Sequence, residues 1–114
     1  MSYGEIKKMN QALVKQENGI VFYWHTNIDL TKKTLFFLHG LTANHTMFDN
    51  QVAFFADKYN VIVWDAPAHG KSRPYNNVSY ENATVVLLQI LNELQIKEVV
   101  LIGQSMGGWS YVKI

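Results

Sequence analysis

Apolar residues occur along the chain in two kinds of pattern, short uninterrupted runs and longer stretches with a helical spacing. Three of the runs have the length and the aromatic or aliphatic content of strands that are buried on both faces of a sheet. They cover residues 35–38, 61–64 and 99–102. We therefore predict three central strands of a parallel sheet.

A helix is predicted in each of the two gaps between these strands. After His45, apolar residues recur at spacings of three and four, which places them on one face of a helix. These residues are Phe48, Val52, Phe55 and Tyr59. The second helix is predicted over residues 80–95, which contain neither Gly nor Pro, with Ser79 as its N-cap.

The pattern before the first central strand is that of a β-hairpin. Residues 12–16 and 20–25 are predicted strands, and Asn18-Gly19 between them tolerates the positive φ that a tight hairpin turn needs. Residues 66–77 contain both prolines and are predicted to form a loop. A hairpin followed by alternating strands and helices predicts an α/β fold, with an antiparallel start and then parallel strands joined by right-handed crossovers.

Composition and charge restrict the class of protein and its partners. A chain of 114 residues has room for one domain or for part of a larger one, and 48% hydrophobic residues predict a buried core. The formal net charge is +1 and no face concentrates Lys and Arg, so nucleic acid is not an expected partner. No apolar stretch has the length of a membrane span or resembles the core of a secretion signal. We expect no membrane association and a cytoplasmic location.

One short motif carries the strongest chemical signal. Gly103-Gln104-Ser105-Met106-Gly107 directly follows the third central strand. A serine at a sharp turn from strand to helix needs neighbours without side chains two positions away on each side, and Gly103 and Gly107 meet this need. The alternatives are a glycine-rich turn with an inert serine and a phosphate-binding turn. The placement after a buried strand favours Ser105 as a catalytic nucleophile.

The segment His39-Gly40-Leu41 closes the first central strand. Gly40 allows a sharp backbone turn that leaves N–H groups pointing outward, and an oxyanion hole needs such donors. In the nucleophile-elbow arrangement one donor is the N–H after the serine, here Met106, and the other comes from this loop, here Leu41. We interpret His39 as a buried residue that shapes the loop, the alternative being a role in proton transfer.

Residues 65–72 follow the second central strand and end in Gly70-Lys71-Ser72, which resembles the end of a phosphate-binding loop. Such a loop needs a glycine five residues before Gly70, where this chain has Asp65. Nucleotide binding is therefore rejected, and we expect no cofactor and no metal. Asp65 is interpreted as a carboxylate that accepts backbone N–H groups in its own loop, and a catalytic Asp65 is the alternative.

Taken together, His39-Gly40, residues 65–72 and residues 103–108 resemble the α/β-hydrolase superfamily, most closely its bacterial esterase-like members. Ala68 stands where these members usually have the first glycine of the second motif, a departure that concerns the loop backbone. The resemblance implies that the second strand is antiparallel, that the fourth lies between the second and the third, and that the fifth lies beside the third. Residues 1–114 are then an incomplete α/β-hydrolase domain, with the first five strands and the start of the helix after the nucleophile.

The resemblance also implies catalytic residues that this sequence does not show. The family's acid and histidine follow later strands, whereas nine residues follow Ser105 here. A serine needs an oriented base to react at neutral pH, so we expect a fragment that is inactive alone. Its fifth strand would be an apolar edge with unpaired backbone groups, through which copies of the fragment could associate.

For the complete protein, the resemblance implies hydrolysis of an ester or related acyl bond of a small molecule through an acyl-enzyme on Ser105. Carbon–carbon bond hydrolases, cofactor-free haloperoxidases and a lyase of menaquinone synthesis can use the same elbow and stay as alternatives. A non-catalytic binding or receptor-like homologue is a further alternative. Dehalogenases and epoxide hydrolases are disfavoured, because their elbow carries an aspartate where this chain has Ser105.

Overall fold

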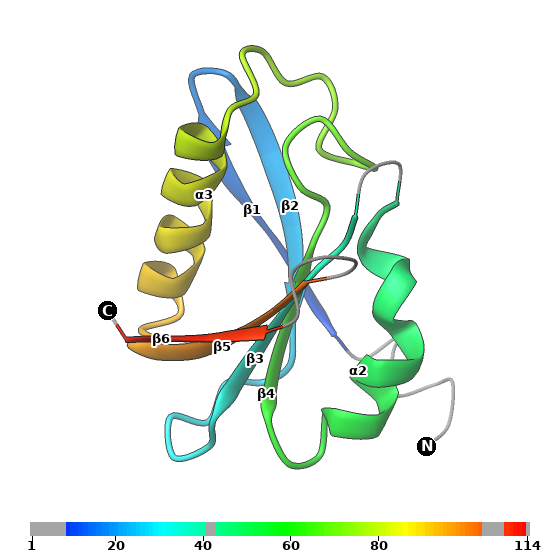
Figure 1. Cartoon of the computed structure of the whole chain (residues 1–114), viewed down its shortest axis with the longest axis vertical. Coiled ribbons are helices and arrows are strands. Elements are labelled where there is room, and N and C mark those ends of the chain that lie inside the picture. Colours follow the sequence, from blue (N-terminus) through cyan, green and yellow to red (C-terminus); the bar gives the residue numbers. More distant parts are fainter. Residues whose placement is uncertain (1–8, 41–42, 104–108, 114) are drawn as a thin grey trace.

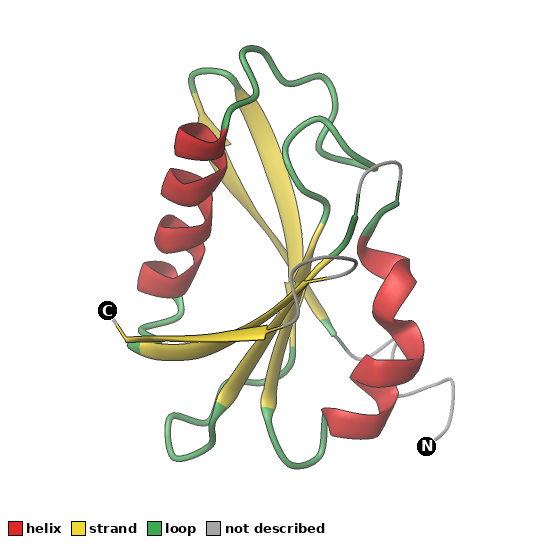
Figure 2. Cartoon of the chain, in the orientation of Figure 1, coloured by secondary structure: helices red, strands yellow, loops and turns green. Residues whose placement is uncertain are grey.

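A six-stranded mixed sheet with a helix on each face forms the computed structural model (Figure 1, Figure 2). The structure describes residues 9–40, 43–103 and 109–113. The strands are β1 (Asn10–Gln16), β2 (Gly19–His25), β3 (Thr34–Leu38), β4 (Asn60–Trp64), β5 (Glu98–Gly103) and β6 (Trp109–Lys113). The helices are the 3₁₀ turn η1 (His45–Phe48), α2 (Asp49–Phe55) and α3 (Tyr80–Glu93). Among the helices of the described residues, none has both the length and the apolar character needed to cross a membrane.

The strands lie in the order β1-β2-β4-β3-β5-β6. The β1–β2 hairpin and the β2–β4 pair are antiparallel, whereas β3 pairs in parallel with β4 on one side and with β5 on the other. This arrangement confirms the order of the first five strands that the family resemblance implied. It also confirms the hairpin and the positions of the three central strands predicted from the apolar runs, although in β5 only Val99 is fully buried.

The two faces of the sheet bury separate sets of apolar side chains, because neighbouring residues of a strand point to opposite faces. In β3, Phe36 belongs to the cluster beneath α3 and Phe37 to the cluster beneath η1 and α2. Figure 1 shows the two helices on opposite sides of the sheet. The α3 side includes Val86, Ile90 and Leu91, and the α2 side includes Phe48 and Val52, each with an exposed fraction of 7% or less. The predicted apolar face of α3 is therefore confirmed. That of the first helix is confirmed as far as Phe55, where α2 ends, and Tyr59 lies beyond the helix.

The ends of α3 show one confirmed prediction and one shifted boundary. Ser79 caps the helix, since its hydroxyl accepts a hydrogen bond of 3.1 Å from the Asn82 backbone N–H. The helix ends at Glu93, two residues before the predicted end. Gln95 has a φ of 59°, and the Ile96 N–H donates to the Leu91 carbonyl at 2.9 Å. This left-handed turn ends the helix without a glycine.

The segment after the predicted elbow differs from the expectation. Residues 109–113 form strand β6 rather than the start of a helix, and β6 pairs antiparallel with β5. An edge strand with unpaired backbone groups gains a hydrogen-bonded partner in this way, and Trp109, Tyr111 and Val112 are residue types that favour strands. The predicted unpaired edge at β5 is therefore wrong, because β5 has neighbours on both sides.

The packing of α3 on the sheet leads to a first prediction. Ile90 is fully buried, so Ile90→Ala should lower the free energy of unfolding by about 2 to 5 kcal/mol through lost apolar burial and a residual cavity. Leu88→Ala is the matched control, because Leu88 is on the same helix but 42% exposed. Urea unfolding, followed by circular dichroism, measures the free energy of unfolding of both variants. Equal losses in the two variants would contradict the described orientation of α3.

Candidate active site

The carboxyl ends of three parallel strands meet at one edge of the sheet. Leu38 at the end of β3 pairs in register with Gly103 at the end of β5, and β4 runs parallel on the other side of β3. The loop that starts at His39 and the motif that starts at Gly103 therefore leave the sheet from adjacent strands. This juxtaposition is the one that a nucleophile and its oxyanion donors require.

The structure describes part of the predicted site. His39 and Gly40 lie directly after β3, and Gly103 is the last residue of β5. Ser105, Met106, Gly107 and Leu41 fall outside the described residues. Their assigned roles as nucleophile, oxyanion donors and elbow glycine stay predictions.

His39 links the ends of β3 and β4. Its Nε2 accepts a hydrogen bond of 3.0 Å from the Ala66 backbone N–H, and its Nδ1 lies 2.9 Å from the Gly40 carbonyl oxygen. An Nε2 that accepts places the proton of a neutral ring on Nδ1, which then donates to Gly40. Burial lowers the pKa of His39 and so favours this neutral form. Both ring nitrogens therefore bond to the backbone, which supports the interpretation that His39 shapes the loop.

Asp65 is buried just after β4, with an exposed fraction of 1%. Its Oδ1 accepts from the backbone N–H of His45 at 2.7 Å and from the His45 ring Nδ1 at 2.8 Å. Its Oδ2 accepts from the Lys71 backbone N–H at 2.8 Å. Burial raises the pKa of Asp65, but the hydrogen bonds from His45 and Lys71 outweigh burial and hold the pKa below its ordinary value. The interpretation of Asp65 as an acceptor for backbone N–H groups is confirmed.

The pairing of His45 with Asp65 was not predicted from the sequence. Asn44 signals a helix start, and its side chain does accept from the Thr46 N–H at 2.9 Å, but this signal only places His45 in the first turn. The His45 ring also stacks on Trp24 of β2, with ring centroids 3.6 Å apart. Residues separated by twenty positions carry no local pattern that would show either contact.

The chain has four histidines, and all four belong to the described residues. In His25, His39 and His69, Nδ1 lies within 3.1 Å of a backbone carbonyl oxygen. In His45, Nδ1 bonds to a carboxylate, the arrangement that orients a catalytic imidazole. However, Asp65 follows β4, and β3 separates β4 from the strand that leads to Ser105. The pair therefore joins η1 to the end of β4 and is not assigned as the base for Ser105.

The loop after Asp65 is held tightly against the carboxylate. The Ser72 hydroxyl donates to the Asp65 carbonyl oxygen at 2.6 Å and accepts from the Phe22 N–H at 2.9 Å. Gly70 has a φ of 48°, and a Cβ atom there would lie 2.4 Å from Asp65 Oδ2. Ala68 has a φ of 70°, in the left-handed region that favours glycine. The departure from the family motif at Ala68 thus places an alanine where the backbone suits glycine.

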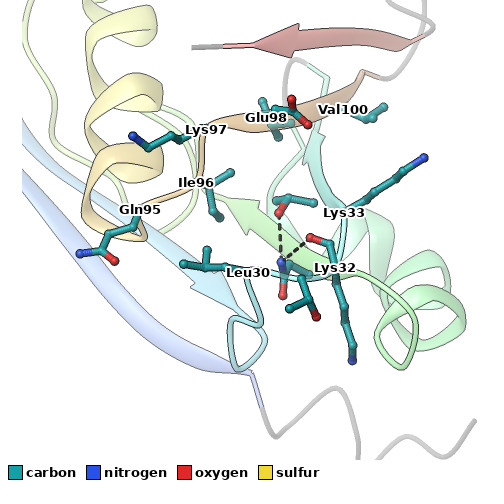
Figure 3. A pocket seen from close by; sticks show the side chains of 12 residues that line it. Leu30, Lys32, Lys33, Gln95, Ile96, Lys97, Glu98 and Val100 are labelled. Carbon is teal, nitrogen blue, oxygen red and sulfur yellow. Dashed lines mark hydrogen bonds between the residues drawn. The ribbon is translucent and has the colours of Figure 1, made fainter.

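A cavity of about 890 Å³ lies away from this edge. Its lining comes from the amino ends of β3, β4 and β5 and from the α3–β5 connection, which is the opposite edge of the parallel strands (Figure 3). The side chains of Lys33 and Lys97 extend from it in different directions, so these two charges do not converge on a ligand (Figure 3). Among the described residues, no group of three or more His, Asp or Glu side chains could hold a metal ion.

The order of the first five strands and the motifs that follow the parallel strands are those that the family resemblance implied. A comparison with protein-family models agrees with this resemblance. The family model for the alpha/beta hydrolase fold matches residues 33–109. The chain belongs to this family.

Individual relatives place the chain within the family. It is 31% identical over 93 residues to an uncharacterized hydrolase, YugF, of Bacillus subtilis, a match that covers 80% of this chain and 34% of the relative. It is 34% identical over 103 residues to 3-oxoadipate enol-lactonase 1 of Acinetobacter baylyi, covering 90% and 39%. A solved bacterial membrane phospholipase A superimposes with a TM-score of 0.73 at 19% identity, covering 90% and 33%, which shows the fold alone. The chain thus spans about a third of the length of the relatives it matches.

The lowered pKa of Asp65 predicts how its contribution to stability depends on pH. Because the carboxyl binds protons less readily in the folded state, its stabilising effect is complete above the unfolded pKa of about 3.9 and is lost as the pH falls through the lower folded pKa. Asp65→Asn should therefore melt at a lower temperature than the wild type at pH 7, and the difference should narrow below about pH 4. Melting curves between pH 3 and 7 test this. A difference that widens toward acid would contradict the assignment.

The backbone at Ala68 gives a further prediction. Ala68→Gly should raise the free energy of unfolding by about 0.5 to 1 kcal/mol, since a left-handed φ costs alanine about 1 to 2 kcal/mol and glycine's greater freedom when unfolded offsets part of the gain. Ala66→Gly is the control, because Ala66 does not have a positive φ and should lose stability. Denaturant unfolding of both variants and of the wild type measures whether each substitution raises or lowers the free energy of unfolding.

Proposed function

We propose that the protein hydrolyses an ester or related acyl bond of a small molecule, with Ser105 as the nucleophile. The observation that carries this proposal is the register pairing of Leu38 with Gly103. Because of this pairing, the His39-Gly40 loop and the Gly103–Gly107 motif begin at adjacent strands on the same edge of the sheet. A serine hydrolase needs its nucleophile and its main-chain oxyanion donors within a few ångströms of one carbonyl group.

In the proposed reaction, the Ser105 hydroxyl attacks the carbonyl carbon of the substrate, and its proton passes to a base. The N–H groups of Leu41 and Met106 stabilise the negative charge on the carbonyl oxygen of the tetrahedral intermediate. Collapse expels the alcohol and leaves an acyl-enzyme on Ser105. Water then attacks this ester, releases the acid and restores the hydroxyl.

We assign the base and its orienting acid to parts of the whole protein other than the described residues. In three of the four histidines Nδ1 lies beside a backbone carbonyl oxygen, and in His45 it bonds to Asp65 at the end of β4. The names of several relatives support this class of substrate, whereas another is named as a putative non-heme haloperoxidase, one of the alternative chemistries for the same elbow. Of the supporting relatives, one is named as an enol-lactonase and others as diacylglycerol lipases, and these names denote cleavage of ester bonds.

The test of this proposal is Ser105→Ala in the full-length protein. We expect kcat for p-nitrophenyl acetate to fall by about a thousandfold or more, because only the hydroxyl that forms the acyl-enzyme is removed. Labelling by a fluorophosphonate probe should be lost in the same variant. Steady-state kinetics and in-gel fluorescence measure the two effects.

Ser79→Ala provides the matched control, because Ser79 serves as the cap of α3. This variant should keep its labelling and its kcat. Hydrolysis by Ser105→Ala at the wild-type rate would contradict the nucleophile. A wild-type protein that neither reacts with the probe nor hydrolyses esters would instead favour a non-catalytic binding homologue.

A further inference from the structure

The two ends of the loop between β3 and η1 are attached to two adjacent residues after β4. At its beginning, His39 Nε2 accepts from the Ala66 N–H at 3.0 Å. At its end, the backbone N–H and the ring Nδ1 of His45 bond to Asp65 Oδ1 at 2.7 and 2.8 Å. Asp65 and Ala66 are adjacent in sequence, so one rigid strand end fixes both ends of the loop.

The segment between these two attachments is short and bonded to itself. The Ala43 N–H donates to the Gly40 carbonyl at 3.2 Å. Asn44 then caps η1 through its bond to the Thr46 N–H. A shift of either attachment would therefore move Gly40 and Ala43, the described residues on either side of the predicted donor Leu41 in the sequence.

The attachment at His45 has the features of a strong and specific contact. Its acceptor is a buried carboxylate, and hydrogen bonds to an ionised acceptor are about twice as strong as neutral ones. The ring is also held from one side by Trp24, with the two ring planes 18° apart. This stacking sets the plane in which Nδ1 can approach Asp65.

We propose that His45 is a positioning residue for the predicted oxyanion hole, because its bond to Asp65 fixes the end of the loop whose sequence contains the predicted donor Leu41. This inference rests on the proposed function, because it needs Ser105-dependent ester hydrolysis as its readout. The oxyanion donors act mainly on the transition state, so their displacement lowers kcat more than it raises KM. A misplacement of about 1 Å can cost up to about a hundredfold in rate, and we expect about a tenfold fall for a loop still fixed at His39.

The experiment compares three variants of the full-length protein with p-nitrophenyl acetate as substrate. His45→Phe keeps an aromatic ring to stack on Trp24 but removes the donor to Asp65. His45→Asn places an amide N–H near the position of Nδ1 and should recover most of the rate. His25→Phe is the matched control, because His25 is a half-buried histidine of β2 whose Nδ1 lies 2.7 Å from the Thr26 carbonyl oxygen, outside this loop.

Rates are expressed per active site, counted by complete reaction with a fluorophosphonate probe. We expect His45→Phe to lower kcat per titrated site about tenfold with KM within about twofold, and His25→Phe to leave both unchanged. Affinity for an alkyl boronic acid, which forms a tetrahedral adduct with an active serine, should fall in parallel with kcat. A purely structural role would reduce the number of titrated sites and leave kcat per site unchanged, and that result overturns the inference.

Two further outcomes separate this inference from the proposed function. If Ser105→Ala keeps its activity, the proposed function fails, whatever His45 does. If Ser105 is essential but His45→Phe matches wild type per site, only the inference fails. Should His45→Phe not fold, Asp65→Asn takes its place, since the amide cannot accept from both His45 and Lys71 through its two terminal atoms. The same tenfold loss per site is then expected, and its absence overturns the inference.

Discussion

A buried negative charge at the end of β4 organises the carboxyl edge of this sheet. The Asp65 carboxylate is almost completely removed from water, and a charge in that position is tolerated only when hydrogen bonds replace the lost solvent. Two segments provide them, η1 through His45 and the loop after β4 through the Lys71 N–H. Both segments are consequently bonded to the end of β4, and the backbone path of each depends on its hydrogen bonds to the Asp65 carboxylate.

The buried Asp65 also constrains the backbone conformation of the loop that follows it. Gly70 must approach the carboxylate so closely that a side chain would collide with it, and its positive φ suits the same turn. Ser72 bonds to the Asp65 carbonyl and to the Phe22 N–H, which connects this loop to the antiparallel hairpin. The hairpin at the start of the chain and the candidate site thus share one hydrogen-bond network, although their residues are far apart in sequence.

The apolar patterns predicted most of the fold because strands buried on both faces and helices with one apolar face each leave a distinct periodicity. Residues 35–38 and 61–64 became β3 and β4 with almost the predicted bounds. The segment that became β6 was not predicted, since its pairing depends on the exposed edge of β5 and not on a local signal. The contact of His45 with Asp65 was missed for the same physical reason, because a hydrogen bond between distant residues leaves no mark on either local sequence.

Most of the hydrogen bonds at this edge of the sheet join a side chain to a main-chain group. His39 bonds to main-chain atoms of Ala66 and Gly40, and Asp65 accepts main-chain N–H groups of His45 and Lys71. Every residue except proline has a main-chain N–H donor. The sequence is therefore constrained at a few side-chain acceptors and glycines rather than at most positions. Chains only 31 to 34% identical can therefore belong to one family. Because one fold supports many chemistries, differences in substrate within this family must arise from side chains around the edge rather than from the shared backbone.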